Sequence, residues 1–222
     1  MMEERSQGDH LEGSGDCAAP SRREVRRESR RDAILEVASA SFLENGYAGT
    51  TMSGIAAELG GSKGTLWSYF PSKDLLFGAV LDRVTDAFRQ QLTLTLNAAD
   101  PIETALTKFC TKYLTKLTVP QSIALHRLVI GEAARFPEMG RIFYERAPWK
   151  TQELLAGYLE AAMDCGKLRR HDSFAAAQYL TSLCIARSHQ QLVSGVIDEL
   201  PADRIREEVD HAVTVFLRAF RP

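Results

Sequence analysis

Apolar side chains recur along the chain at the three- and four-residue spacing of helices. Between residues 33 and 45, Ile34, Val37, Ala38 and Phe42 fall on one face, and Gly46 follows at a position that commonly ends a helix. The best alternating run, LTLTL at residues 92–96, continues a helical pattern and is interpreted as a helix end. The pattern therefore predicts an all-α fold.

Capping hydroxyls and prolines divide the rest of the chain into further helices. Thr51 can cap the second helix and Ser62 the third, while Pro71 ends the third and Ser72 can cap the fourth. The helices expected after residues 33–45 span about 52–59, 63–70, 73–97, 101–117, 121–135, 138–146, 148–165, 173–194 and 201–220.

This order of helices predicts three parts. Residues 1–21 are rich in Glu, Gly and Ser and are expected to form a disordered tail. Residues 22–71 are expected to form a small helical head that starts with a basic arm. Residues 72–222 are expected to form a larger bundle, to which the helix at 72–97 connects the head.

Composition narrows the class of protein. The 222 residues carry a net charge of −2, so any nucleic-acid binding must come from a local concentration of positive charge. The four cysteines form no C-x-x-C pair, and no metal or cofactor site is expected; buried free thiols are the interpretation. Because residues 1–21 lack an apolar core, no signal peptide is expected, and no apolar run is long enough to predict a membrane span; a cytoplasmic protein is expected.

Positive charge is concentrated at residues 21–31, SRREVRRESRR, where six arginines face two glutamates. One interpretation is a solvated start of the first helix, with charges paired along its surface. The other is an arm that contacts DNA phosphates or the minor groove through Arg22, Arg23, Arg26 and Arg27.

The segment Gly60-Gly61-Ser62-Lys63-Gly64 fits G-x-S-x-G, the nucleophile elbow of serine hydrolases. That elbow needs a strand before the serine, and here a helix is expected instead. Two short helices around a glycine turn are also the layout of a helix-turn-helix, whose second helix enters the major groove by its N-terminus. No catalytic residue is therefore expected, and the segment is interpreted as a DNA-reading element.

The same region resembles the DNA-binding head of tetracycline-repressor-type (TetR/AcrR) transcriptional regulators. The matching motifs are ENGY, TTM..IA...G, SKGTLW.YF and SK..L, in order between about residues 30 and 80. The resemblance implies an all-helical dimer with two-fold symmetry, a third helix that reads DNA, and a ligand in the C-terminal bundle that releases the operator.

Carried over by position, the DNA-contacting places of that family fall on Thr51, Ser53, Lys63, Gly64, Thr65, Trp67, Tyr69 and Lys73. Two departures matter. Trp67 stands where many members have tyrosine, so it keeps one N–H donor and loses the acceptor. Between Asp32 and Lys73 only Lys63 and Lys73 are positive, so the arginine arm is expected to supply much of the electrostatic attraction to phosphates.

The C-terminal half resembles the AefR-like subtype of the same family through HRLVIGEAARFPEMGRIFYERAP, residues 126–148. A mostly apolar ligand pocket with a few polar contacts is expected there. The candidate lining residues are Phe109, Tyr113, His126, Glu132, Phe143 and Trp149. The alternative for each is a place in the core. Helices 173–194 and 201–220 are the expected dimer surface, since the last carries a wide apolar stripe.

Together these features predict a ligand-responsive transcriptional regulator, and a repressor in particular. It would bind a palindromic operator in double-stranded DNA as a homodimer, and a small, largely apolar effector would release it. The competing hypothesis is a helical small-molecule carrier or enzyme that retains a vestigial DNA-binding head. A hydrolase built on Ser62 is the third.

Overall fold

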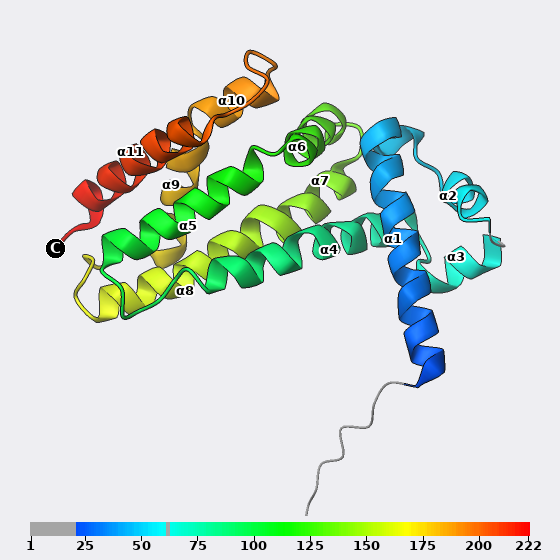
Figure 1. The fold of residues 1–222 in the computed structure, drawn as a ribbon, viewed down its shortest axis with the longest axis horizontal. Helices are drawn as coiled ribbons and strands as arrows, with labels where there is room; N and C mark the ends of the chain where they lie inside the picture. Colours follow the sequence, from blue (N-terminus) through cyan, green and yellow to red (C-terminus); the bar gives the residue numbers. More distant parts are fainter. Residues whose placement is uncertain (1–20, 61–62) are drawn as a thin grey trace, which may run out of the picture.

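The computed structural model of the chain describes residues 21–60 and 63–222, and its regular elements are all helices (Figure 1). They are α1 (Arg22–Gly49), α2 (Met52–Glu58), α3 (Lys63–Tyr69), α4 (Lys73–Thr93), α5 (Ile102–Leu117), α6 (Pro120–Glu132), α7 (Pro137–Tyr144), the π-helical turn η1 (Glu145–Trp149), α8 (Lys150–Asp164), α9 (Ser173–Ile185), α10 (Ser188–Val193) and α11 (Ala202–Phe220). The all-α prediction is confirmed. The predicted tail, apart from Ser21, and the predicted cap Ser62 lie outside the described residues.

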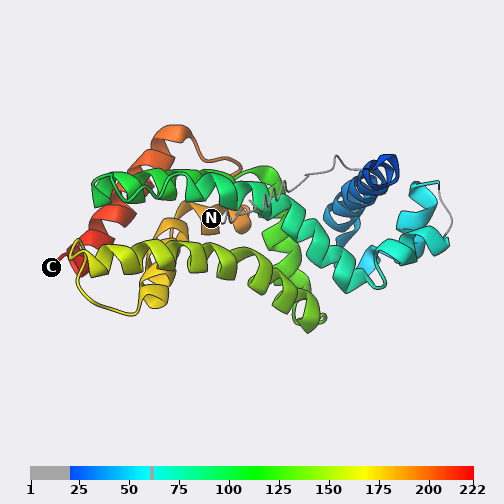
Figure 2. The same cartoon turned by 90° about the horizontal axis from the view of Figure 1, so that it is seen from below.

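The molecule is elongated, with a small head at one end and a larger bundle at the other (Figures 1 and 2). Helices α1, α2 and α3 form the head, and α4 runs from the head into the bundle. In the bundle α8 packs along α9, and α11 packs against α5 and α9. Within the described ranges no helix is long and apolar enough to cross a membrane.

Helix α1 begins earlier than the apolar pattern predicts. Ser21 and Glu24 form a capping box: the hydroxyl of Ser21 accepts the Glu24 N–H at 3.3 Å, and the carboxylate of Glu24 accepts the Ser21 N–H at 2.7 Å. The basic segment is therefore the first part of a helix that runs from Arg22. The apolar period located this helix only from residue 33, because exposed arginines carry no apolar period; the helical start that one interpretation of residues 21–31 expected is present.

The predicted break before Pro148 is also absent. Helix α7 continues through η1 into α8, and Pro148 lies inside the π-helical turn. A proline cannot donate a backbone hydrogen bond, and the wide turn places it where the regular ladder is already interrupted. The hydroxyl of Thr151 donates to the carbonyl of Ala147 at 3.1 Å and satisfies one acceptor of the turn.

The predicted helix 173–194 is instead two helices. Arg187 has φ −116° and ψ −100°, which interrupts the helix between α9 and α10. Glu208, a buried carboxylate on α11, accepts hydrogen bonds from the hydroxyl and the backbone N–H of Ser188. A tertiary contact thus supplies the hydrogen-bond acceptor for the first backbone N–H of α10. The fourth helix also ends earlier than predicted, at Thr93, where Thr95 donates its hydroxyl to the Leu92 carbonyl at 2.6 Å.

The hydrophobic core of the head extends beyond the head itself. Leu35, Phe42 and Phe77 lie within it, and Val129 of α6 and Ile142 of α7 complete it. The second core joins α4, α5, α8, α9 and α11. Helix α4 contributes to both, through Phe77 at its start and Leu92 at its end.

Glu132 connects the last turn of α6 to the end of α1. Gly46 has φ +72°, which bends the chain, and the two amides that follow are presented to the carboxylate. Glu132 accepts the N–H of Tyr47 at 2.9 Å and of Ala48 at 2.7 Å. A Cβ at residue 46 would lie 2.4 Å from the carboxylate, so only glycine fits there.

We expect Glu132→Ala to lower the free energy of unfolding by about 1–3 kcal/mol, because one part-buried and one exposed N–H group lose their acceptor. Glu132→Gln keeps one carbonyl acceptor and should lose less. Urea titration measures the change, and Glu160→Ala, at an exposed position on α8, is the matched control. Equal losses for Glu132→Ala and the control would contradict the assigned role.

Candidate DNA-binding surface and ligand cavity

Helix α2 packs against both α1 and α3, and α2 and α3 each bury one face in the core of the head. Ile55 and Ala56 of α2 are buried, as are Leu66 of α3 and Phe70 just after it. The exposed or half-buried positions around them are Thr51, Ser53, Gly64, Thr65, Trp67 and Tyr69. These predicted contact residues thus have exposed or half-buried side chains on or beside two helices that pack against each other; Figure 1 shows the two helices. Lys63 begins α3, and its side chain is outside the described part.

The side chain of Thr51 already forms a hydrogen bond to the backbone. Its hydroxyl oxygen accepts the N–H of Gly54 at 3.0 Å and caps α2. The hydroxyl proton remains available to a phosphate oxygen. A Cβ at Gly54 would lie 3.1 Å from that hydroxyl oxygen, so the glycine leaves the cap uncrowded.

Lys73, a predicted DNA contact, also has hydrogen-bond partners within the head. Its ammonium donates to the carbonyls of Tyr47 at 2.8 Å and Thr50 at 3.2 Å, and it lies 4.2 Å from the centre of the Tyr47 ring. Burial lowers the pKa of Lys73, and the hydroxyl of Tyr47 is hydrogen-bonded to Asp74. Lys73 therefore fastens the start of α4 to the end of α1, which the sequence pattern could not reveal.

The arginines of α1 are better placed to meet phosphates. Arg22, Arg23, Arg26 and Arg27 are exposed, at the end of α1 that projects past α3 (Figure 1). Glu24 directs its carboxylate at Ser21, and among the described residues these four guanidinium groups form no ion pair. Residues 22–31 thus form the solvated start of the first helix, as the first interpretation expected. The four exposed arginines nevertheless remain available to phosphates.

The bundle encloses a cavity of about 150 Å³, which we call the core cavity. It lies between α4, α5, α6, the α7–η1–α8 segment and α9, and it is lined by Val84, Thr85, Phe88, Tyr113, Lys116, Leu117, Ser122, Leu125, His126, Phe143, Ala147, Pro148, Thr151, Gln152, Thr181, Ser182 and Ile185. Apolar and aromatic groups dominate, with a few polar ones between them. This composition is typical of a site for a small apolar molecule.

Three of the six predicted ligand residues line the core cavity: Tyr113, His126 and Phe143. Phe109 does not, because it is fully buried beneath Tyr113, with the two rings stacked at 5.9 Å. Trp149 lies on the outside of the bundle, 42% exposed, with its ring 4.5 Å from that of Phe174. Glu132 does not line the cavity either, because it binds the end of α1 where head and bundle meet. Its apolar neighbours in the sequence had suggested a place in the pocket.

The sequence interpretation missed Gln152. It lies on the face of α8 that buries Leu155, Ala156 and Leu159, and a polar residue on such a face was the available signal. Its Nε2 donates to the Thr181 hydroxyl at 3.4 Å, and its buried Oε1 has no donor among the described residues. An unsatisfied buried acceptor costs free energy, which a ligand donor would recover.

His126 lies beside a second histidine. Its ring is 4.9 Å from that of His189 and 5.5 Å from that of Phe143, edge to face in both cases. Its Nδ1 is 2.9 Å from the carbonyl of Ser122, which can only accept, so Nδ1 carries the proton. Burial lowers the pKa of His126 and thus favours the neutral ring.

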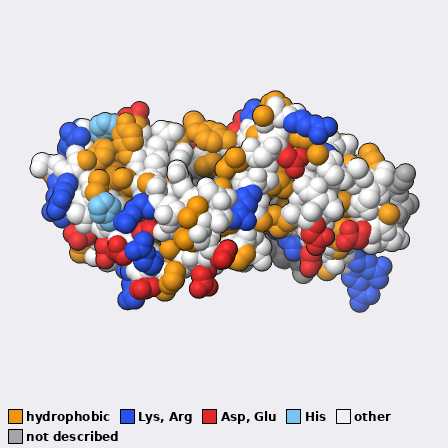
Figure 3. All heavy atoms as spheres, turned by 90° about the horizontal axis from the view of Figure 1, so that it is seen from above, with side chains coloured by type: hydrophobic (Ala, Val, Ile, Leu, Met, Phe, Trp, Pro, Cys, Tyr) orange, Lys and Arg blue, Asp and Glu red, His pale blue; other side chains and the backbone are white. Residues whose placement is uncertain are grey.

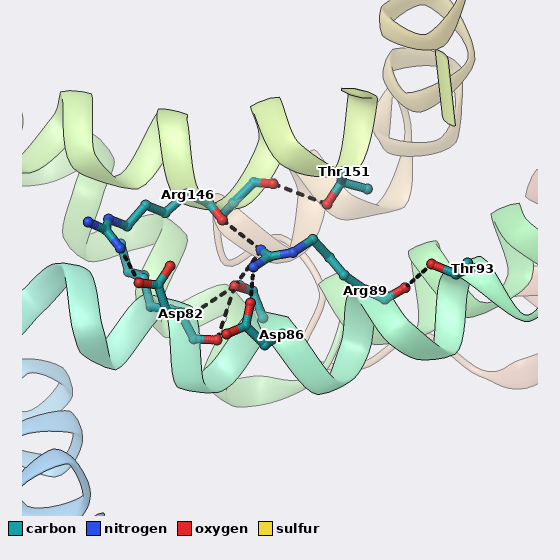
Figure 4. Close-up of polar contacts among 9 residues, drawn as sticks. Asp82, Asp86, Arg89, Thr93, Arg146 and Thr151 are labelled. Carbon is teal, nitrogen blue, oxygen red and sulfur yellow. Dashed lines mark hydrogen bonds and ion pairs between the residues drawn. The ribbon is translucent and has the colours of Figure 1, made fainter. Parts of the chain in front are cut away.

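A polar network ties the cavity wall to α4 (Figure 4). Arg89 of α4 donates to the carbonyl of Arg146 in η1 at 2.8 Å and pairs with Asp86. Arg146 in turn pairs with Asp82 of α4 and lies across Gly78, where a Cβ would be 3.0 Å from its Nε. Since η1 also lines the core cavity through Ala147 and Pro148, one wall of the cavity is bonded to the helix that leads to the head.

An apolar hollow of about 490 Å³ lies between α9 and α11. Leu183, Ala186, Val215 and Phe216 line it, with Tyr179, which is 53% exposed, at its edge. Figure 3 shows hydrophobic side chains gathered at this end of the molecule, next to histidines. Both helices belong to the predicted dimer surface.

The histidine pair predicts a pH dependence of stability. Burial and the neighbouring His126 lower the pKa of His189 from 6.5 to about 4. The folded protein then binds fewer protons than the unfolded chain, so the free energy of unfolding should fall as the pH drops from 6.5 towards 4. His189→Gln should make the slope shallower, by up to about 1.4 kcal/mol per pH unit. Urea titrations across this window test it; an unchanged slope would refute it, and His211→Gln on the exposed face of α11 is the control.

Comparison with known proteins gives two matches to family models. Residues 34–80 match the model described as bacterial regulatory proteins, tetR family. Residues 104–222, more than half of the chain, match the model described as the C-terminal domain of AefR-like transcriptional repressors. The segment before Ser62 is helix α2 rather than a strand, in agreement with these matches and not with a nucleophile elbow.

Individual proteins agree with the family models. A TetR-family transcriptional regulator of Mesorhizobium loti has a similar structure, with TM-score 0.76, 26% identity, and coverage of 88% of this chain and 99% of the other. The flavonoid-responsive regulator FrrA gives TM-score 0.73 and 31% identity, over 88% of this chain and 98% of its own. The HTH-type transcriptional regulator YhgD of Bacillus subtilis is 23% identical over 62% of this chain and 69% of its own length.

The helix-turn-helix head, the all-helical bundle and these matches lead to one conclusion. The chain belongs to the TetR family of transcriptional regulators, which bind DNA and are not enzymes, and its C-terminal domain is of the AefR-like type.

Proposed function

We propose that this protein is a ligand-responsive repressor that binds a palindromic operator as a homodimer and leaves it when a small, largely apolar molecule occupies the core cavity. The observation that carries the proposal is the physical link between the two sites. Helix α4 lines the cavity through Val84, Thr85 and Phe88, and its first turn is fastened to the head.

The DNA contacts divide into two groups. The N-terminal turn of α3, with Lys63, Gly64 and Thr65, would meet base edges and phosphates in the major groove, and Trp67 and Tyr69 would contact the backbone. The arginines at the start of α1 would supply most of the attraction to phosphates, since Lys73 is committed to backbone carbonyls.

The dimer would form through α9 and α11, around the apolar hollow. Two copies related by a two-fold axis would then present two heads to successive half-sites, about 34–36 Å apart or somewhat more. A ligand that fits only the arrangement with the wrong head spacing shifts the population away from DNA. The similarity to FrrA, a flavonoid-responsive regulator, supports a response to a small molecule here.

We expect Lys63→Ala with Thr65→Ala to abolish specific DNA binding without unfolding the protein or splitting the dimer. The operator is first selected from randomised duplexes, and a palindromic sequence is the expected product. Fluorescence anisotropy then compares operator with scrambled DNA. Wild-type affinity of the double variant would refute the assignment of α3, and recovery of no sequence at any salt would favour the carrier hypothesis.

Replacement of Arg22 and Arg26 by glutamine should weaken binding to operator and scrambled DNA alike. It should also reduce the slope of log affinity against log salt by about 2, because each lost phosphate contact removes roughly one released counterion. Glu28→Gln on the same exposed segment is the control and should not reduce the slope. A slope unchanged in the arginine variant would mean that the segment does not reach DNA.

Tyr179→Asp should convert the dimer to a monomer of 24.7 kDa, because it places a charge in the apolar hollow at an exposed position that costs no core packing. Light scattering after size exclusion measures the mass. Leu94→Asp, at a site 82% exposed after α4, is the matched control and should stay dimeric. A dimeric Tyr179→Asp would place the interface elsewhere.

A further inference from the structure

A second cavity lies where the head meets the bundle. It measures about 220 Å³, larger than the core cavity, and we call it the junction cavity. It is lined by Ser39, Phe42 and Leu43 of α1, Phe77, Val80, Leu81 and Val84 of α4, Lys116 of α5, and Gln121, Ser122 and Leu125 of α6. Most of these groups are apolar, and three of them belong to the long helix of the DNA-binding head.

The two cavities are neighbours. Val84, Lys116, Ser122 and Leu125 line both of them. Val84, at the border of the two cavities, is 39% exposed. The partition is made of side chains, which change rotamer far more easily than backbone moves.

The polar groups of the core cavity define what the polar end of a ligand must offer. The Oε1 of Gln152 is an acceptor without a donor, and the Nε2 of Gln152 is already used on Thr181. Because the Nδ1 of His126 carries the proton, the Nε2 of the neutral ring is a second acceptor. A ligand gains most by bringing hydroxyl donors, whereas a carboxylate would meet acceptors there.

The aromatic side chains that line the core cavity favour a flat ring. Phe88, Tyr113, His126 and Phe143 all line it, and aromatic side chains prefer edge-to-face or offset contact with another ring. A cavity of about 150 Å³ holds one small aromatic ring, a size at which engineered cavities bind benzene. A larger ligand must therefore extend elsewhere.

We propose that the effector site has two chambers and takes a hydroxylated aromatic molecule with an apolar tail: the phenol-type ring occupies the core cavity beside Gln152 and His126, and the tail passes Leu125 into the junction cavity against α1. The proposal rests on the ligand-responsive function proposed above. The tail would lie between Phe42 of the head and Val80 of α4. The ring would supply specificity, while the tail would separate α1 from α4 and release DNA.

Calorimetry with two phenols tests the second chamber. In the wild type, 4-hexylphenol should bind roughly a hundredfold more tightly than 4-ethylphenol, because each additional buried methylene contributes about a three- to fourfold gain. Ser39→Phe fills the junction cavity from α1 and should reduce that gain to below about tenfold while 4-ethylphenol binds as before. Ser39→Ala leaves the chamber open and should behave as the wild type.

If Ser39→Phe does not fold, Gln121→Trp replaces it, because Gln121 lines the junction cavity from an exposed position. The same chain-length gain in a folded filling variant as in the wild type would overturn the two-chamber proposal. So would the absence of a gain in the wild type.

Two further probes test the polar end. 4-Hexylanisole, which lacks the O–H donor, should bind about tenfold more weakly than 4-hexylphenol. Gln152→Met removes the acceptor at similar size and should reduce this preference. Heptanoate, a carboxylate whose best partner would be Lys116, should bind more weakly than 4-hexylphenol. Tighter binding of heptanoate would overturn the phenol class.

DNA release is measured separately from binding. With operator present, 4-hexylphenol should release the protein at concentrations that saturate the site, whereas saturating 4-ethylphenol should leave most of it bound. Equal release by both would refute the role of the junction cavity. Calorimetry needs no DNA, so a protein that binds no operator yet shows the chain-length gain would refute the repressor function and leave the two-chamber site standing.

Discussion

Helix α4 has to bury side chains in two separate cores, and the rest of the structure depends on that constraint. Leu76, Phe77 and Leu81 anchor its first half in the head, and Leu92 anchors its end in the bundle. An uninterrupted helix transmits displacement along its axis because its backbone hydrogen bonds resist bending. In the proposed mechanism, a change at the cavity wall would reach the head through α4.

Specific polar contacts hold both ends of that helix. At the head, Lys73 binds the carbonyls that end α1, and Glu132 binds the amides after Gly46, so bundle and head share one junction. At the cavity, Arg89 and Arg146 join α4 to the π-helical turn. These contacts use charged groups that the sequence alone would assign to ligand or DNA. Among the described side chains, the exposed arginines at the start of α1 form no ion pair and remain available to phosphates.

The periodic pattern predicted most helices, because burial of one face imposes a period that the chain must carry. It failed where a tertiary contact replaced a local signal. Glu208 of α11 satisfies the start of α10, and the π-helical turn accommodates Pro148. The predicted ligand residues show the same limit. Tyr113, His126 and Phe143 line the core cavity, whereas Phe109, Trp149 and Glu132 do not. Residue type and spacing alone do not tell which face of a helix borders a cavity.

By itself the sequence determined the all-helical fold, the helix-turn-helix head and the family, since caps, glycine turns and apolar periods are local properties written in neighbouring residues. Only the tertiary structure decided that Lys73 and Glu132 form hydrogen bonds to the end of α1, that Gln152 has an unsatisfied acceptor, and that a second cavity adjoins α1. Those features arise where residues distant along the chain meet, and the packing that brings them together leaves no periodic trace in the sequence.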